Sequence, residues 1–284
     1  MSDRNLPEYS VLMSVYAKDN PDYFDLAIES MVKQTVPFHD LTLVCDGPLP
    51  SGLDGRVAAW QKKLADRLNV VRLSTNGGLG PALAAGMPCC GCDVIARMDS
   101  DDISRPDRME KLLDKKQSDN LELVGGAIEE FDHEPGDMGS VRMPPLTMEE
   151  IDTWLKGRNP FNHVSVVYDR HVVEAVGGYE PFPWMEDYWL WARMIAGGCR
   201  CANIPDVVVD VRVGEGMYAR RSNTPFLISQ VRFFETLHDL GLINRPEEAW
   251  AIAQRVIATA MPEKLLKASY NLLLREKAPK DNGE

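Results

Sequence analysis

The stretch Val94-Ile-Ala-Arg-Met-Asp-Ser-Asp-Asp102 decides how this chain folds. Its first five residues form a mostly apolar run that predicts a strand, and three carboxylates follow directly within four positions. Arg105-Pro106 comes next, and Pro106 is well placed to open a helix because proline is favoured in the first turn. We therefore expect a strand that ends in an acidic loop and is followed by a helix.

Earlier runs repeat this pattern of a strand that stops at a loop. They are Tyr9–Tyr16, then Leu41–Cys45 before Asp46-Gly47-Pro48, and then Val70–Leu73 before Asn76-Gly77-Gly78. Helical patterns separate them, the first from about Pro21 to Gln34. This alternation predicts an α/β fold with a Rossmann-like, mostly parallel sheet and helices on both faces. Ligands of such sheets bind beyond the carboxyl ends of the strands, so the loops should share one crevice lined by Tyr16, Asp46, Asn76 and Asp99.

The alternation breaks down after a fifth apolar run, Leu121–Gly125. A helix is predicted near Thr147–Lys156, the aromatic stretch Trp184–Trp191 opens another, and a last β-rich run covers Val207–Val213. From about residue 223 the pattern is helical throughout. We expect a main domain over residues 1–222, with halves at about 9–120 and 121–222, and a C-terminal helical appendage over 223–284.

Charge and composition exclude several classes of protein. Lys and Arg total 31 against 43 Asp and Glu, a net charge of -12, so the protein repels polyanions and nucleic acid is not expected as a partner. Residues 1–9 lack the basic and apolar segments of a signal peptide, and no run of about 18 apolar residues is present. We expect a cytoplasmic protein without a membrane-spanning helix.

The cysteines and the C-terminal tail each allow two interpretations. Four of the six cysteines would suffice for a zinc site, but the Cys-x-Cys spacings at Cys90–Cys92 and Cys199–Cys201 lack the usual two-residue gap. Reduced cysteines in the core are favoured instead. The tail mixes apolar and basic residues after Met261, and it either lies peripherally on the inner face of the cell membrane or packs on the main domain.

The carboxylates Asp99, Asp101 and Asp102 would repel one another at a strand end unless a cation neutralised them. Oxygen ligands suit Mg²⁺ or Mn²⁺, which bind one or two carboxylates together with substrate phosphates. The alternative is an acidic loop that caps the helix near Pro106. In the same way, Asp46 is either an acceptor for a base or ribose or a simple turn residue.

The pair Glu186-Asp187 stands among aromatic residues, including Trp184 and Trp191. Partial dehydration would raise the proton affinity of a carboxylate there, as a general base requires, and the rings offer a sugar an apolar face. The alternative is an amphipathic helix with an aromatic core stripe and an acidic first turn.

These motifs together resemble the family 2 glycosyltransferases with the GT-A fold, from about Tyr9 to Val213. The resemblance rests on the following residues in order: Ser14-Val15-Tyr16, Asp46-Gly47, Asn76 with Gly78, Asp99–Asp102 with Pro106 and Arg108, His163, and Glu186-Asp187. It implies a nucleotide-binding half at about 9–120 and an acceptor half at about 121–222. It also implies a nucleotide-sugar donor and an inverting, metal-dependent transfer of a hexose.

Roles for single residues follow from this resemblance. Ser14, Tyr16, Asp46, Asn76 and Asp99 would bind the nucleotide-sugar, Asp101 and Asp102 would bind Mn²⁺ or Mg²⁺, and Asp187 would be the catalytic base. His163, Trp184 and Glu186 would contact the acceptor or the donor phosphates. Cys45 departs from the family, which usually has two acids before the glycine of this loop.

That departure, Arg220-Arg221 and the basic tail make the chain similar to bacterial amylovoran and O-antigen type galactosyltransferases. The similarity implies a UDP-sugar donor and an acceptor that is a glycan or an undecaprenyl-diphosphate-linked sugar, with Arg220 and Arg221 as diphosphate contacts. Two alternatives remain: a sugar-phosphate nucleotidyltransferase, disfavoured because Ser14–Asp19 lacks a glycine, and a non-catalytic sugar-nucleotide binding protein, disfavoured by Asp101 and Asp187.

Overall fold

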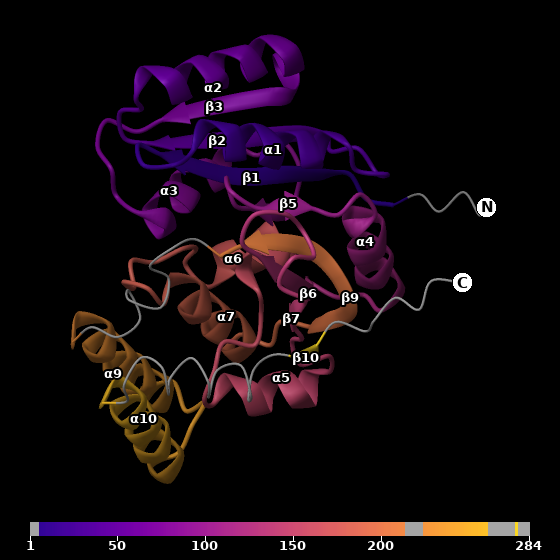
Figure 1. Ribbon diagram of the computed structural model, residues 1–284. Coiled ribbons are helices and arrows are strands. Elements are labelled where there is room, and N and C mark those ends of the chain that lie inside the picture. The colour runs from indigo at the N-terminus through magenta and orange to yellow at the C-terminus, as the bar shows by residue number, and fades with distance from the viewer. Residues whose placement is uncertain (1–5, 214–223, 261–275, 278–284) are drawn as a thin grey trace.

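The computed structural model describes residues 6–213, 224–260 and 276–277 (Figure 1). Their strands join in one sheet, whose main order is β10-β7-β6-β8-β4-β1-β2-β3. The N-terminal half supplies four strands that run parallel: β1 (Tyr9–Tyr16), β2 (Asp40–Asp46), β3 (Leu68–Arg72) and β4 (Val94–Met98). This half confirms the predicted alternation of strands and helices.

The second half of the sheet is mixed, because short antiparallel pairings join the longer parallel ones. It contains β5 (Ile103–Ser104), β6 (Leu123–Phe131), β7 (Ser140–Arg142), β8 (Val167–Asp169) and β9 (Cys201–Arg212). β8 lies antiparallel between β4 and β6, so β6, the fifth predicted strand, runs in the same direction as β4 but is not its neighbour in the sheet. β9 pairs parallel with β6 and antiparallel with β5, which brings the end of β9 beside the acidic segment after β4.

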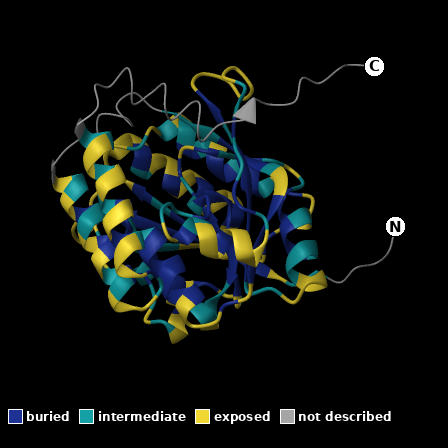
Figure 2. Ribbon diagram, turned by 90° about the horizontal axis from the view of Figure 1, so that it is seen from below, coloured by how far each residue is buried: buried dark blue, intermediate teal, exposed yellow. Residues whose placement is uncertain are grey.

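Helices cover both faces of the sheet, and the alternation of side chains along β1 shows why. Val11 and Met13 face one core, which α1 (Pro21–Val32), α2 (Ser51–Leu64) and α4 (Arg108–Ser118) complete. Leu12 faces the other core, which contains α3 (Leu79–Gly86) and α7 (Glu186–Ala196). Because successive strand residues point to opposite faces, β1 contributes to both cores, and so do β2 and β4. Figure 2 shows the strands buried between exposed outer helices.

Local signals account for several helix ends. Asn20 caps α1 with its side chain and Pro21 occupies the first turn. Thr147 and Glu150 form a capping box for α5 (Met148–Leu155). This helix confirms the one predicted near Thr147–Lys156. α4 begins at Arg108, two residues after Pro106. The remaining short helices are α6 (Arg170–Ala175) and the single turns Ala65–Arg67, Met87–Cys89 and His163–Ser165.

The region predicted to be an appendage contains α9 (Thr224–Asp239) and α10 (Arg245–Ala260), which lie side by side (Figure 1). Phe233 of α9 stacks on Tyr188 of α7 with ring centroids 4.2 Å apart, and Lys156 pairs with Glu247 of α10 at 2.7 Å. The two helices therefore pack on the main domain. None of the described helices has both the length and the apolar character needed to cross a bilayer.

The expectation of helices up to the C-terminus is wrong at β10 (Glu276–Lys277). These two residues pair antiparallel with Ser140 and Val141 of β7, at the edge of the sheet. An edge strand offers free backbone hydrogen-bonding groups, so a short segment of almost any sequence can add to it. The helical pattern of the sequence carried no information about this pairing.

Candidate active site

Asp46, the last residue of β2, holds the loop that follows β3. Its carboxylate accepts hydrogen bonds from the Asn76 side chain at 2.8 Å and from the backbone N–H groups of Gly77 and Gly78 at 2.8 and 2.9 Å. Gly47 has a φ of 86°, and a Cβ there would lie 2.7 Å from the backbone nitrogen of Asn76, so only glycine fits. Asp46 and the loop at 76–78 therefore form one unit at the carboxyl edge of the sheet.

β1 ends beside this unit and is tied to the acidic segment. Tyr16 is opposite Asp46 in the β1–β2 register and is exposed, and Ser14 is partly exposed. The Tyr16 N–H donates to the Asp19 carboxylate at 3.1 Å, which also accepts from the Ser100 hydroxyl at 2.7 Å. Three strand ends predicted to share a crevice, those of β1, β2 and β4, thus lie together.

The three aspartates after β4 have different surroundings. Asp99 pairs with the guanidinium of Arg97, which is buried on β4. Asp102 is buried, and its carboxylate accepts the backbone N–H of Arg212 at 2.8 Å. Asp101 is exposed, and the guanidinium of Arg212 donates to its backbone carbonyl at 3.2 Å rather than to its carboxylate. The Asp101 carboxylate is therefore open to the crevice.

Asp101 is an acid of this segment whose negative charge a cation would stabilise. One side of it faces solvent, but protein displaces water from the other side, and this effect together with the charges of Asp99 and Asp19 raises the pKa of Asp101 to about 6. Burial, followed by the charges of Asp101 and Asp99, raises the pKa of Asp102 well above its ordinary range. Carboxylate oxygens of Asp99 and Asp101 fit the preference of Mg²⁺ and Mn²⁺ for hard ligands.

Glu186 and Asp187 begin α7, and α3 approaches them closely. A Cβ on Gly80 of α3 would lie 3.4 Å from the Glu186 Cβ, so the glycine lets the two helices meet. Burial, followed by the charge of Asp187, raises the pKa of Glu186 to about 7, and Asp99 adds to this effect. The acid pair therefore lies within electrostatic reach of the acidic segment after β4.

Hydrogen bonds fix the Asp187 carboxylate. One oxygen accepts from the Asn159 side chain at 2.7 Å, and the other accepts the backbone N–H of Tyr188 at 2.7 Å. Burial raises the pKa of Asp187, and these two hydrogen bonds oppose the rise by stabilising the anion. The result is an oriented carboxylate with increased proton affinity, which suits proton abstraction from a hydroxyl.

His163 lies in an aromatic cluster behind the acid pair. Its Nε2 is 3.2 Å from the Tyr179 hydroxyl, and its ring packs edge-on against Trp191 with centroids 5.9 Å apart. Burial, and then the charge of Arg97, holds the pKa of His163 well below its ordinary value, so the imidazole is neutral. This geometry favours a neutral hydrogen-bonding role over a cationic contact to phosphate.

Trp184 marks an aromatic surface beside the acid pair. It has a φ of 62°, which residues other than glycine rarely adopt, and its side chain is 49% exposed. A cavity of about 410 Å³ opens here, with Phe182, Trp184, Trp189 and Ile228 among its lining residues. An exposed aromatic wall of this kind can pack against the apolar face of a sugar.

Four residues that hydrogen bond to predicted site residues or to their segment were not predicted from the sequence. They are Asp19, Arg97, Asn159 and Arg212. Arg97 offered a signal, since it is a charge inside an apolar run and its side chain is fully buried. Asp19 reads as part of the turn before α1, and Asn159 and Arg212 stand in no motif. Arg220, Arg221 and the tail at 261–275 lie outside the described residues, so their predicted contacts stay predictions.

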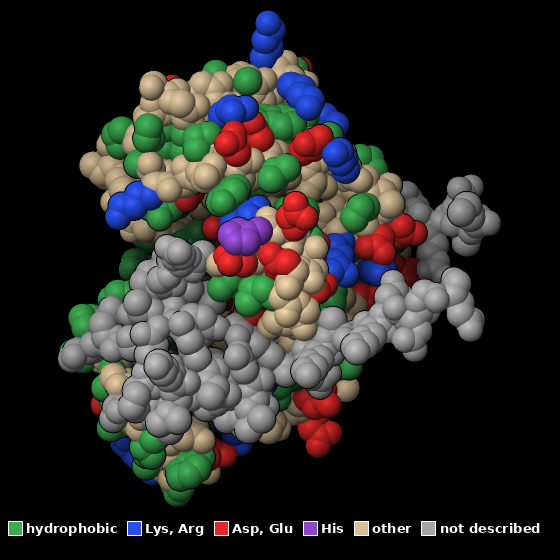
Figure 3. Space-filling view, viewed as in Figure 1, with side chains coloured by type: hydrophobic (Ala, Val, Ile, Leu, Met, Phe, Trp, Pro, Cys, Tyr) green, Lys and Arg blue, Asp and Glu red, His purple; other side chains and the backbone are tan. Residues whose placement is uncertain are grey.

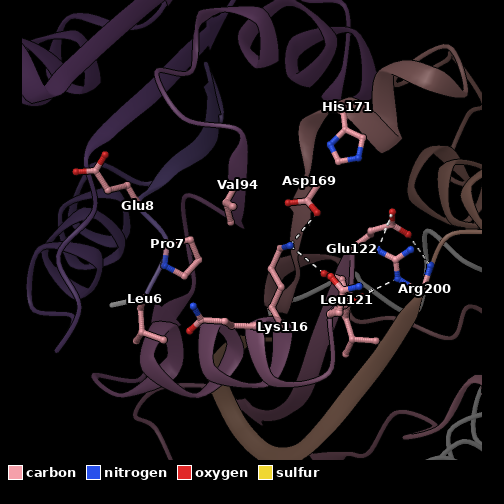
Figure 4. Close-up of a pocket in the computed structure, with 12 residues that line it drawn as sticks. Leu6, Pro7, Glu8, Val94, Lys116, Leu121, Glu122, Asp169, His171 and Arg200 are labelled. Atoms are coloured by element: carbon pink, nitrogen blue, oxygen red, sulfur yellow. Dashed lines mark hydrogen bonds and ion pairs between the residues drawn. The ribbon is translucent and has the colours of Figure 1, made fainter. Parts of the chain in front are cut away.

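A second cavity, of about 730 Å³, lies at the opposite edge of the sheet, near the starts of β4, β6 and β9 (Figure 4). Four of its charged side chains form two ion pairs: Lys116 contacts Asp169 at 2.8 Å, and Arg200 contacts Glu122 at 3.2 Å. Each of these four charged side chains is therefore neutralised by its partner, which does not favour a catalytic role for them. On the face in Figure 3, acidic and basic side chains of the described residues are interspersed.

Comparison with known proteins identifies the family. The model of glycosyl transferase family 2 matches residues 10–177. The chain is 32% identical to the UDP-Gal:alpha-D-GlcNAc-diphosphoundecaprenol beta-1,3-galactosyltransferase of Escherichia coli, over 97% of this chain and 99% of that protein. It is 35% identical to the amylovoran biosynthesis glycosyltransferase AmsE of Erwinia amylovora, over 92% of this chain and 97% of that protein.

A solved structure extends the comparison to the fold. The chain is similar to the mannosyltransferase PcManGT from Pyrobaculum calidifontis, solved in complex with GDP-Man and Mn²⁺, with a TM-score of 0.63 and 17% identity, covering 94% of this chain and 80% of that one. At this identity the likeness concerns the GT-A fold alone. The family match and the two relatives show that this chain is a nucleotide-sugar glycosyltransferase and belongs to glycosyl transferase family 2.

Proposed function

We propose that this protein transfers a hexose from a UDP-sugar, with inversion, to a hydroxyl of a glycan or lipid-diphosphate-linked sugar in bacterial surface polysaccharide synthesis. The observation that carries the proposal is that the Glu186-Asp187 pair lies close to the crevice that contains Asp46 and Asp99. The absence of a side chain at Gly80 allows this close approach. The names of the two relatives support the donor and the acceptor class.

The donor half of the site would use the loops at the ends of β1, β2 and β4. We propose that Ser14, Tyr16 and the unit formed by Asp46 and Asn76 hold the nucleotide. Asp101, with Asp99, would hold a divalent ion whose charge stabilises the departing diphosphate. The sequence predicted that Asp102 also binds the metal, but we propose a structural role for it. Its carboxylate accepts the Arg212 N–H and so holds β9 beside the acidic segment.

The acceptor half would supply the base. The Asp187 carboxylate takes the proton of the acceptor hydroxyl as that oxygen bonds to the anomeric carbon, and the bond from this carbon to the diphosphate breaks with its electron pair leaving on UDP. Asn159 and the Tyr188 N–H orient the carboxylate for this step. Trp184 would pack against the acceptor sugar, and Glu186 and the neutral His163 would complete this side of the site.

Incubation with single nucleotide-sugars tests the donor. UDP is released each time the sugar is transferred, and also when the UDP-sugar is slowly hydrolysed. We therefore expect a UDP-hexose with Mn²⁺ to give measurable release of UDP. This release should increase when a short lipid-diphosphate sugar acceptor is added. GDP- and TDP-sugars serve as controls. Thermal shift should rank the same donor first, since a ligand that binds the folded state raises the melting temperature with its occupancy. Stabilisation and turnover with GDP-sugars alone would contradict the UDP assignment.

Membrane contact is proposed for the outer face of α10. Trp250 and Ile257 lie on this face seven residues apart, and their side chains are 65% and 54% exposed. Exposed apolar side chains on a helix bind at the boundary of lipid headgroups and acyl chains. The double substitution Trp250→Ser and Ile257→Ser should therefore lower sedimentation with anionic liposomes, whereas Leu26→Ser, at an exposed leucine of α1, should not. Equal sedimentation of all three proteins would contradict the contact.

A further inference from the structure

A cluster of metal-binding side chains lies at the edge of the sheet opposite the active site. Glu8, His39 and Cys92 each offer one ligand atom, and these three atoms lie within 4.8 Å of one another. Their backbone segments come just before β1, β2 and β4, which are neighbours in the sheet. Parallel strands start at the same edge, so residues that are 84 positions apart in the sequence meet here.

We propose that Glu8, His39 and Cys92 form a zinc site. A thiolate, an imidazole and a carboxylate are all ligands of Zn²⁺, whereas Mg²⁺ and Mn²⁺ prefer oxygen ligands such as those of Asp99 and Asp101. In a tetrahedral site with bonds of about 2.0–2.3 Å, the ligand atoms stand roughly 3.3–3.8 Å apart. Small side-chain rotations therefore close the observed spacing. Glu8 and His39 are exposed, so water can occupy the fourth position.

Hydrogen bonds hold the backbone of this cluster in place. The His39 N–H donates to the Tyr9 carbonyl at 2.9 Å, and the Cys92 N–H donates to the Ser10 hydroxyl at 2.8 Å. The Ser10 hydroxyl in turn donates to Asp40 at 2.6 Å. The ligands are therefore carried by segments fixed to β1 and β2, which lowers the entropic cost of assembling them around an ion.

Gly91 allows the cysteine loop to approach the histidine. A Cβ at this position would lie 2.8 Å from a carboxylate oxygen of Asp40 and 3.2 Å from the His39 ring, so a side chain would push the loop away. The Arg170 guanidinium also donates to the backbone carbonyls of Cys90 and Cys92 on the other side of the loop. Gly91 thus permits the close approach of Cys92 to His39, and the Arg170 hydrogen bonds hold the loop there.

Glu8 also borders the cavity of about 730 Å³ at this edge. Figure 4 shows its carboxylate turned away from the Lys116–Asp169 pair, so it does not take part in that charge pairing. Zinc here would join the starts of β1, β2 and β4, and we expect it to stabilise the fold without taking part in sugar transfer.

Cobalt substitution tests the site directly. A Cys ligand gives Co²⁺ a thiolate charge-transfer band in the near ultraviolet, and a tetrahedral site gives Co²⁺ strong visible bands. The full-length reduced protein should therefore show both kinds of band with Co²⁺. Both should disappear when Zn²⁺ is added and displaces Co²⁺. Cys92→Ser should abolish the charge-transfer band, and His39→Ala should weaken zinc affinity by about 100-fold or more, because even second-shell changes cost about 10- to 100-fold. The matched control is Cys89→Ser, which removes an exposed thiol three residues away and should change nothing.

Two further measurements separate this site from the catalytic one. Zn²⁺ without nucleotide should raise the melting temperature of the wild-type protein and of Cys89→Ser but not of Cys92→Ser, while all three proteins should melt alike in EDTA. Transfer with Mn²⁺ should be the same in all three. Absence of the charge-transfer band, or its equal loss in both cysteine variants, would overturn the zinc site and leave the proposed function untouched.

Discussion

Substitution of Asp187 by asparagine is expected to lower kcat by about 100-fold to 10,000-fold, the usual contribution of a general base. Asparagine has the shape of aspartate and can still accept the Tyr188 N–H, so the fold should be kept, but it cannot take the acceptor proton. The donor is proposed to bind to loops at the ends of β1, β2 and β4, so the Kd for UDP with Mn²⁺ should change by less than about 2-fold. Initial rates at saturating substrates and calorimetric titration with UDP measure the two quantities.

Glu186→Gln is the matched control, because it neutralises the neighbouring acid in the same helical turn. We expect its kcat to fall far less than that of Asp187→Asn. A larger loss in Glu186→Gln, with activity retained in Asp187→Asn, would transfer the role of base to Glu186. Both variants can be compared by circular dichroism to confirm that α7 is intact.

The pH profile provides an independent check of the base. A base works when deprotonated, and burial raises the pKa of Asp187, so kcat/KM should rise with pH through a value above the ordinary aspartate pKa of about 4. This acidic limb should vanish from the residual activity of Asp187→Asn. A limb that persists near pH 7 would point to Glu186, whose pKa is about 7.

The sequence predicted the N-terminal half of the fold well because its signals are local. Each parallel strand there is an apolar run that stops at a polar or glycine-containing loop, and the strand–helix repeat fixes the neighbours through right-handed crossovers. The antiparallel insertion of β8 between β4 and β6 has no such signal. Val167–Asp169 is only three residues long, and its partners are separated from it by long stretches of chain.

The site could be predicted where function demands a recognisable residue type. Asp46, Asn76 and the acids after β4 were expected in one crevice, and the structure brings the first two into direct contact. The difference between Asp101 and Asp102 could not be foreseen, because it depends on Arg212, which arrives from β9 about 110 residues later. Likewise, no local pattern links Asn159 to Asp187 across the sequence.

Asp101→Asn is the second substitution for which we expect a large effect, through loss of the metal response. The Asp101 carboxylate is exposed to the crevice and is surrounded by the charges of Asp99 and Asp19, so it gains more from a bound cation than a carboxylate in bulk water would. A divalent ion beside a leaving diphosphate contributes several kcal/mol to the transition state, or about 100-fold or more in rate. In wild-type protein, Mn²⁺ should increase both UDP affinity and turnover, and excess EDTA should abolish transfer. In Asp101→Asn both responses should be largely lost.

Asp102→Asn separates metal binding from the general loss of an acid. An asparagine oxygen can still accept the Arg212 N–H, so β9 should stay anchored and the Mn²⁺ response should remain within a few fold of wild type. The pair of variants differs by one position and removes the same charge, so a difference between them reports which carboxylate binds the ion. Equal loss of the Mn²⁺ response in both would make Asp102 a ligand as well, as the sequence predicted. Full activity of wild-type protein in EDTA would instead exclude a metal-dependent mechanism, because the charge of the departing diphosphate would then have to be stabilised by protein groups alone.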